Sequence, residues 1–444
     1  MNRHLKATEN GRRKFIKGLT LGTGALLTSS HNLMGFTNPA EKDISLALIG
    51  AGGMGTNDTN TALSVGGAKL IAVCDLYDAR LAKAKSTWGD HILTTKDYKE
   101  ILSNPEVNTV IIGTPDHWHQ QISIEALKAG KNVYCEKPVI QKIKEGEGLI
   151  KAEQSCKNLV FQAGSQGMSS TGNVIARNII RSGILGKVNF IDGQFSSAPK
   201  DSTSYKTPED ASEKTIWWDR FLGQAPRINF EPQRFFYWRN WKEYSTGMPG
   251  DLFVHVIASV HYIMDTAGPE KVYSTGGLRH HSFGFQNIPD VMLAYIDYPN
   301  KNGLGEFTLS VGANYVDGVS KKWSSLNFRI VGDKGYMDVL WDRVELKMLK
   351  KIETFSTLNE IKHLIGNIQE VSENGYVIKA VSTDRGGHYN HFNNFFNCIR
   401  NNTKPIGDAR FGVQTASVAL LCNESYEQNA PIFWDPTEMK IKRK

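Results

Sequence analysis

Two short motifs, far apart in the chain, contain side chains that could transfer a proton. Glu136-Lys137-Pro138 follows an apolar run, and a lysine at the end of a core strand can hydrogen-bond a substrate hydroxyl and help to move its proton. Asp251 and His255 are four residues apart, which places them on one face if the segment is helical. His255 would accept the hydroxyl proton while a hydride leaves the carbon, and Asp251 would orient the substrate or raise the basicity of the imidazole. We therefore predict Lys137, Asp251 and His255 as the catalytic residues, although an ordinary surface turn could also contain such a lysine.

A glycine-rich turn nearer the N-terminus indicates what could accept the hydride. An apolar run leads into Gly50-Ala51-Gly52-Gly53-Met54-Gly55, and an amphipathic segment follows. Gly50 permits a tight turn, Gly52 lets the backbone approach a pyrophosphate, and Gly55 lets the helix pack close to the strand. The phosphates would lie at the helix N-terminus, where unpaired N–H groups and the helix dipole favour negative charge. The whole turn is therefore predicted to bind a dinucleotide.

An acidic residue indicates which dinucleotide is bound. Asp75 ends a second apolar run, about 20 residues after the turn. A carboxylate at this position accepts hydrogen bonds from both ribose hydroxyls and repels a 2′-phosphate, so NAD is favoured over NADP. The strand, turn, helix and acid together distinguish this pattern from an ordinary glycine-rich loop, which is the alternative.

Three further segments follow apolar runs and are expected to line the same crevice, because ligands of doubly wound sheets bind outside the carboxyl ends of the strands. They are Thr114-Pro115-Asp116, Glu136-Lys137-Pro138 and Gly164-Ser165-Gln166. The expected cofactor contacts in these segments and just after them are Thr114, Pro115, His119, Glu136 and Lys137.

Substrate contacts are expected from aromatic and polar side chains around the crevice. Aromatic faces stack on the apolar face of a pyranose, and arginine forks hold hydroxyls or carboxylates. The candidates are His117, Trp118, Gln166, Trp238 and Arg239. The alternative for the tryptophan-rich segment 196–249 is that it packs a domain interface. We expect no metal, because Asp251, His255 and His261 lack a convincing ligand spacing.

The order of the elements predicts two domains. From Ile44 strands and helices alternate, which indicates a doubly wound parallel sheet, and we assign residues 44–168 to an α/β Rossmann domain that binds NAD. Between residues 272 and 345 apolar and polar residues alternate with period two, which indicates a mostly antiparallel sheet. We assign residues 169–430 to an α+β substrate domain and residues 431–444 to a basic tail.

Charge and cysteine content exclude several classes of protein. The net charge of +7 is concentrated at the two ends of the chain, so the residues between these ends are slightly acidic in sum. A slightly acidic domain lacks the excess of positive charge that binds nucleic acid. The five cysteines contain no CxxC pair, so we expect neither a zinc site nor a disulfide framework.

The first 40 residues are typical of an export signal. They combine Arg12-Arg13-Lys14 with a short, weakly apolar run, and paired arginines are typical of the twin-arginine route for folded, cofactor-loaded proteins. We expect a periplasmic or exported protein, tethered to the membrane if the leader is not cleaved. A basic cytoplasmic N-terminus is the alternative.

Three motifs of this chain together resemble those of the glucose–fructose oxidoreductase/inositol dehydrogenase/MocA (Gfo/Idh/MocA) family. They are the glycine turn, Glu136-Lys137-Pro138 and the Asp251/His255 pair, and the resemblance covers nearly all of residues 44–429. The motifs at 114–119, 217–223, 234–239 and 387–392 resemble its exported bacterial branch. The resemblance implies a Rossmann domain followed by an open, mostly antiparallel sheet that mediates dimers or tetramers. It also implies sugar or polyol substrates and catalytic roles for Lys137, Asp251 and His255.

These observations predict an NAD-dependent oxidoreductase that acts on a sugar or glycoside hydroxyl, with C3 as the expected position. Export implies a tightly held cofactor that is reoxidised in place, for example by an external electron acceptor. An NAD-dependent glycosidase that works through transient oxidation at C3 is one alternative. A sugar-binding sensor without turnover is the other.

Overall fold

The structure is a computed structural model that describes residues 43–196, 207–280, 286–300, 302–315, 317 and 326–442. The predicted signal segment, residues 1–40, lies outside the described residues. Among the helices of the described ranges, none is both long and apolar enough to cross a membrane.

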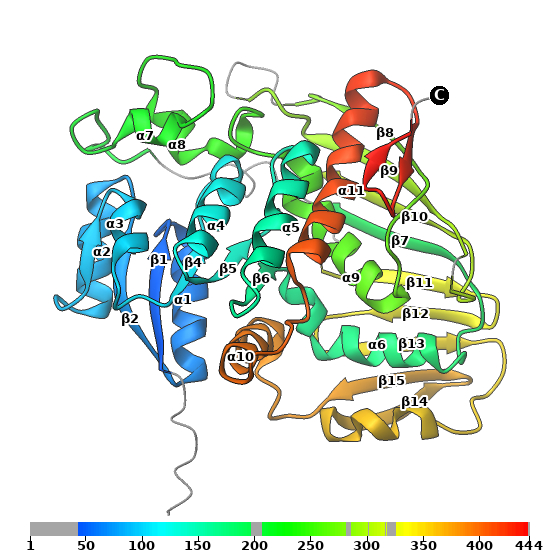
Figure 1. Ribbon diagram of the computed structural model, residues 1–444. Coiled ribbons are helices and arrows are strands. Elements are labelled where there is room, and N and C mark those ends of the chain that lie inside the picture. The colour runs from blue at the N-terminus through cyan, green and yellow to red at the C-terminus, as the bar shows by residue number, and fades with distance from the viewer. Residues whose placement is uncertain are drawn as a thin grey trace, which may run out of the picture. The chain divides into compact units, whose positions relative to one another are not determined.

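The first part of the chain forms the predicted parallel sheet (Figure 1). Its strand order is β3-β2-β1-β4-β5-β6, and all pairs are parallel. The strands are β1 (Ile44–Ile49), β2 (Ala68–Cys74), β3 (Leu93–Thr95), β4 (Thr109–Ile112), β5 (Asn132–Glu136) and β6 (Phe161–Gly164). The helices between them are α1 (Gly53–Val65), α2 (Asp78–Trp88), α3 (Tyr98–Ser103), α4 (His119–Lys128) and α5 (Gly146–Ser155). These strands are short runs of Val, Ile and Ala that are buried in the structure. A sheet whose two faces are both covered needs apolar side chains on each face, and this is why such runs predicted the strands.

The second sheet contains eleven strands in the described part of the chain, in the order β14-β15-β13-β12-β11-β7-β10-β9-β8-β16-β17. All neighbours are antiparallel except β7 and β10. Its first strands are β7 (Val188–Ser196), β8 (Lys271–Gly277), β9 (Val291–Tyr298), β10 (Phe307–Asn314) and β11 (Phe328–Gly332). The others are β12 (Gly335–Val339), β13 (Arg343–Met348), β14 (Ile365–Ser372), β15 (Gly375–Ala380), β16 (Ile432–Asp435) and β17 (Lys440–Ile441). This is the mostly antiparallel open sheet that the period-two pattern predicted.

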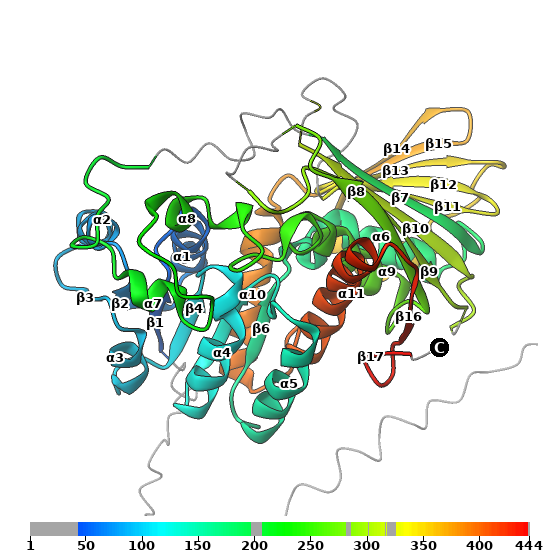
Figure 2. The ribbon, with the colours of Figure 1, turned by 90° about the horizontal axis from the view of Figure 1, so that it is seen from above.

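Helices cover one face of the second sheet, and Figure 2 shows them between the two sheets. They are α6 (Thr171–Arg181), α9 (Val254–Met264) and α11 (Ala409–Gln428). Their apolar sides pack on the inward residues of the strands, such as Met292, Ala294 and Ile296 of β9. This core fixes the start of α9 relative to the parallel sheet.

The end of the chain differs from the predicted domain limits in two ways. Residues 432–435 form β16, which pairs with β8 and buries Ile432 and Trp434, so the basic tail begins later than predicted. Helix α10 (Gly386–Asn401) returns to the parallel sheet, where Phe392, Phe395 and Phe396 complete the core around the first strands. The residues 44–168 are therefore not a self-contained unit.

Candidate active site

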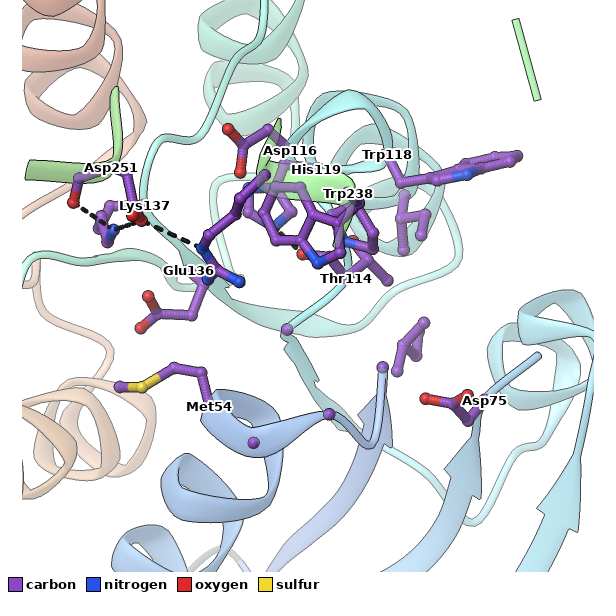
Figure 3. Close-up of a pocket in the computed structure, with 18 of the residues that line it drawn as sticks. Met54, Asp75, Thr114, Asp116, Trp118, His119, Glu136, Lys137, Trp238 and Asp251 are labelled. Carbon is purple, nitrogen blue, oxygen red and sulfur yellow. Dashed lines mark hydrogen bonds and ion pairs between the residues drawn. The ribbon is translucent and has the colours of Figure 1, made fainter. Parts of the chain in front are cut away.

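A cavity of about 730 Å³ extends from the carboxyl ends of the parallel strands to the start of α9 (Figure 3). Its wall contains all but two of the residues that the sequence predicted for the site. They are Gly50, Gly52, Gly53, Met54, Asp75, Thr114, Pro115, Trp118, His119, Glu136, Lys137, Gln166, Trp238, Arg239, Asp251 and His255. The exceptions are Gly55, which lies beneath the turn, and His117.

The glycine turn has the geometry of a phosphate site. A Cβ on Gly50, whose φ is +97°, would lie 2.7 Å from the backbone of Gly113, and a Cβ on Gly55 would lie 2.1 Å from the carbonyl oxygen of Gly50. Glycine is therefore required at both positions for helix α1 to start so close to β1. Added Cβ atoms on Gly52 and Gly53 would meet nothing within 4 Å, so the N-terminus of α1 faces open space. Such a terminus attracts a pyrophosphate.

Asp75 lies at the end of β2, on the opposite side of Figure 3 from Asp251. Its carboxylate accepts hydrogen bonds from the backbone N–H groups of Ala51 (2.8 Å) and Tyr77 (3.0 Å). The Arg80 guanidinium lies 3.4 Å from the same carboxylate. These donors hold Asp75 at the cavity wall, where it can accept from the hydroxyls of a ribose.

The other end of the cavity holds the predicted proton-transfer residues. The Lys137 ammonium donates to the Asp251 carbonyl oxygen at 2.8 Å and to its carboxylate at 3.1 Å, and Arg239 Nε lies 3.3 Å from the same carboxylate (Figure 3). Burial alone would raise the pKa of Asp251, but these two cations hold it well below its ordinary value. Burial, and then the charge of Lys137, lowers the pKa of His255 to about 3.

A local irregularity brings Asp251 and His255 to the same wall. Residues Pro249–Phe253 form a π-helical turn that runs directly into α9, which contains His255. A π turn closes through i→i+5 hydrogen bonds, so residues four apart still share a face, as the sequence spacing predicted. Single π turns recur at functional sites.

This arrangement can carry out acid–base chemistry on a hydroxyl. Because its pKa is low, His255 is a neutral imidazole at neutral pH and can accept a proton. The Lys137 ammonium can donate a hydrogen bond to the substrate oxygen, and Asp251 fixes the position of that ammonium. Trp238 and Arg239 lie beside them, with the Arg239 guanidinium 4.2 Å from the centre of the Trp238 ring system.

A second carboxyl lies behind Glu136. Asp58 of α1 is fully buried, and neither of its carboxyl oxygens has a donor in the described structure. Burial, and then the charge of Glu136, raises the pKa of Asp58 well above its ordinary value. Burial raises the pKa of Glu136 to about 7, while Lys137 and Gln166 act in the opposite direction. Gln166 Nε2 donates to the Glu136 carboxyl at 2.6 Å.

His117 and Trp118 both contact another segment of the chain through their ring nitrogens. Both rings hydrogen-bond the carbonyl oxygen of Phe221, at 2.8 Å from His117 Nε2 and 3.0 Å from Trp118 Nε1. In Figure 3 the Trp118 indole points away from Lys137 and Asp251. His117 is absent from the cavity wall, so the structure does not support the predicted contact of this residue with the substrate. Trp118 lines the cavity, and its contact with the substrate stays a prediction.

His119 lines the cavity, but its two ring nitrogens face the carbonyl oxygens of Pro138 (2.7 Å) and Thr114 (2.8 Å). Its ring therefore joins the loops that follow β4 and β5, and it positions neighbouring cofactor contacts.

Several residues of the wall were missed by the sequence analysis. Around Lys137 these are Tyr315, Trp341 and His388, and around Asp75 they are Arg80, Arg220, Phe235 and Phe236. His388, Arg220 and Phe235 fall in the motifs at 387–392, 217–223 and 234–239, but these three residues had no role assigned to them from the sequence. For Arg80, Tyr315 and Trp341 the sequence carried no signal beyond residue type.

Two models of one protein family match this chain. One, described as "Oxidoreductase family, NAD-binding Rossmann fold", matches residues 44–164. The other, described as "Oxidoreductase family, C-terminal alpha/beta domain", matches residues 223–433, so the two together span most of the chain.

Curated relatives and solved structures agree with these matches. An inositol 2-dehydrogenase of Salmonella typhimurium is 29% identical over 174 residues, which are 39% of this chain and 52% of the relative. A glycosyl hydrolase family 109 protein of Shewanella baltica is 25% identical over 207 residues, 40% of this chain and 44% of the relative. The chain thus spans about half the length of the curated relatives it matches. A levoglucosan dehydrogenase solved with NADH and levoglucosan has the same fold, with a TM-score of 0.66 at 17% identity over 88% of this chain and 99% of that one.

The buried acid pair predicts how stability changes with pH. The folded state binds protons on Asp58 and Glu136 more tightly than the unfolded chain, whose carboxyls ionise near their ordinary pKa of about 4. The free energy of unfolding therefore falls as pH rises from about 4 to about 7. Asp58→Asn removes one of these acids and should raise the free energy of unfolding more at about pH 8 than at about pH 5, as measured by thermal or urea unfolding. The exposed Asp90→Asn is the matched control, and parallel pH curves for Asp58→Asn and the unaltered protein would contradict this account.

Cofactor choice is predicted to depend on Asp75. Asp75→Ser removes the charge that opposes a 2′-phosphate and leaves Arg80 to bind it, so the ratio of NAD affinity to NADP affinity should fall by about tenfold or more in equilibrium titrations. Asp78→Ser removes a nearby acid that does not line the cavity and should leave this ratio unchanged. An unchanged ratio in Asp75→Ser would mean that Asp75 does not face the ribose.

Proposed function

Because the chain belongs to the Gfo/Idh/MocA family of oxidoreductases, we propose that it catalyses the NAD-dependent oxidation of a sugar or glycoside hydroxyl, at C3 of the ring. The observation that carries this proposal is the contact of Lys137 with Asp251 beside His255, at the end of an NAD-binding cavity. The relatives that act on inositol or were solved with levoglucosan support a polyhydroxylated substrate.

The proton path is assigned to the residues at that end. NAD supplies the hydride acceptor when bound. Lys137 donates a hydrogen bond to the reacting oxygen, and the neutral His255 imidazole takes the hydroxyl proton. Asp251 holds Lys137 in place through both its carbonyl and its carboxylate oxygens. Trp238 offers an aromatic face for the sugar ring, and Arg239 binds its hydroxyls.

A second function, NAD-dependent glycoside cleavage, is favoured by the similarity to the glycosyl hydrolase family 109 protein. In this reaction C3 is oxidised, the aglycone leaves by elimination, water adds to the double bond, and C3 is reduced again. No net oxidation occurs, so NADH does not accumulate, and the same acid–base residues serve both directions.

One experiment tests the two reactions together. Protein loaded with one equivalent of NAD is mixed with p-nitrophenyl glycosides, and NADH absorbance and p-nitrophenol release are recorded in parallel. Stoichiometric NADH without p-nitrophenol is expected for net oxidation, and continuous p-nitrophenol release without NADH indicates cleavage. If a broad panel of sugars and polyols gives neither signal, the enzymatic proposal is wrong.

The role of His255 is tested by substitution. His255→Ala should lower kcat by about a hundredfold or more, the usual contribution of a positioned base, while bound NAD is retained. His363→Ala, which replaces an exposed histidine far along the chain, is the control. A His255→Ala protein that keeps full turnover would exclude this residue as the base, and a loss of sugar affinity alone would favour the sensor alternative.

We also propose that the second sheet joins copies of this chain. Helices cover one face of this sheet (Figure 2), whereas Phe190, Tyr273, Leu293 and Tyr295 point from the other and are 37–50% exposed. A row of large apolar side chains of this kind marks an interface. Leu293→Asp should lower the mass measured by light scattering to that of one chain, whereas Leu93→Asp in β3 should not. A single-chain mass for the unaltered protein would refute the proposal.

A further inference from the structure

Residues 207–246, here called the clasp, lie over the carboxyl ends of the first strands of the parallel sheet. They include α7 (Trp218–Leu222) and α8 (Pro232–Phe236), and Figure 1 shows these helices above α2–α4. Backbone hydrogen bonds join Trp217 N–H to the Leu76 carbonyl (2.9 Å) and Asp78 N–H to the Thr215 carbonyl (3.1 Å). The clasp is thus bonded directly to the loop that follows Asp75.

Side chains strengthen this junction. Arg220 of α7 forms an ion pair with Asp97, and its guanidinium lies 5.0 Å from the centre of the Tyr98 ring. Lys96 Nζ donates to the Thr215 carbonyl at 3.1 Å. The aromatic rings of the clasp pack in one cluster with Tyr77, which immediately follows the ribose-binding end of β2.

The motif Thr114–His119 holds the clasp from the other side. The Asp116 carboxylate accepts from the N–H (2.9 Å) and the hydroxyl (2.7 Å) of Thr246. His117 and Trp118 both bond the Phe221 carbonyl, as described above. The two motifs noted at 114–119 and 217–223 are therefore the two sides of one contact.

The clasp forms a wall of the cavity at its Asp75 end. The lining there combines Arg80 and Tyr98 of the parallel-sheet domain with Arg220, Phe235 and Phe236 of the clasp. The Arg80 guanidinium lies 5.2 Å and 5.7 Å from the ring centres of Phe235 and Phe236. Because Lys137 and His255 occupy the far end and the pyrophosphate site lies between, this end faces the adenosine half of the dinucleotide.

We propose that the clasp forms an adenine site and retains NAD as a resident cofactor that stays bound through many turnovers. Arginine planes and aromatic rings are the groups that stack on a purine, and here they come from both sides of the cavity. The adenosine half cannot leave until the contacts of Arg220, Asp116 and Trp118 with their partners have opened. The clasp therefore sets the rate of cofactor release.

The rate at which bound NADH exchanges with free NAD measures cofactor release directly. The experiment needs no sugar, so its outcome is independent of the proposed oxidation. Protein loaded with NADH is freed of excess nucleotide and mixed with a large excess of NAD, and the loss of bound-NADH fluorescence gives the release rate. Arg220→Ala should accelerate release by about tenfold or more, because loss of a partly buried charge pair acts on dissociation. Asp97→Asn breaks the same ion pair but keeps a residue that can cap α3, so it should act in the same direction with the fold preserved.

Arg329→Ala is the matched control. Arg329 pairs with Asp338 at 2.6 Å and lies 4.0 Å from the Tyr336 ring centre, so it repeats the chemistry of Arg220 within the second sheet. It should leave the release rate unchanged. The proposal is overturned if the unaltered protein exchanges NADH within the mixing time, or if the Arg220 and Asp97 variants release it no faster than Arg329→Ala.

Discussion

The ion pair between Lys137 and Asp251 is the interaction on which the rest of the site depends. It joins the end of β5, in the parallel sheet, to the π turn that leads into α9, one of the helices that cover the second sheet. The lysine side chain is 11% exposed, so its charge needs a partner at close range, and Asp251 supplies both a carboxylate and a carbonyl oxygen. The same positive charge helps to keep His255 neutral. This one contact thus fixes the geometry of the pair and adds to the effect of burial on the protonation state of His255.

Sequence reasoning succeeded where a pattern is local. The parallel strands, the glycine turn and the acid after β2 follow from short runs of residue types, and the spacing of Asp251 and His255 survives the change from a regular helix to a π turn. It did not reveal the hydrogen bonds of His117 and Trp118, because position near a strand end does not determine which way a side chain points. Their partner, Phe221, is about a hundred residues away, and only the fold brings it near. The end of the second domain, predicted at residue 430, was wrong because it leaves out β16. The two inward residues of this strand, Ile432 and Trp434, are too few to predict a strand from the sequence.

The tryptophan-rich segment contributes to two parts of the molecule. It was expected either to bind substrate or to pack an interface, and the structure shows one part of it packed on the parallel-sheet domain and another part in the cavity wall. Trp217 and Trp218 lie in the part that packs on the parallel-sheet domain, whereas Trp238 and Arg239 reach the wall near Asp251. One continuous segment therefore lines the cavity from the end near Asp75 to the end near Lys137.

The position of α10 has a consequence for modularity. The aromatic row Phe392, Phe395 and Phe396 packs against Leu46 and Leu48, yet it is encoded after the whole of the second sheet. A fragment cut after β6 would expose that apolar face to water, and most of the chain must be synthesised before the first sheet is complete. The nucleotide-binding half of this protein is consequently not a unit that can be transplanted or recombined on its own, and changes in helix α10 act on the core of the first sheet.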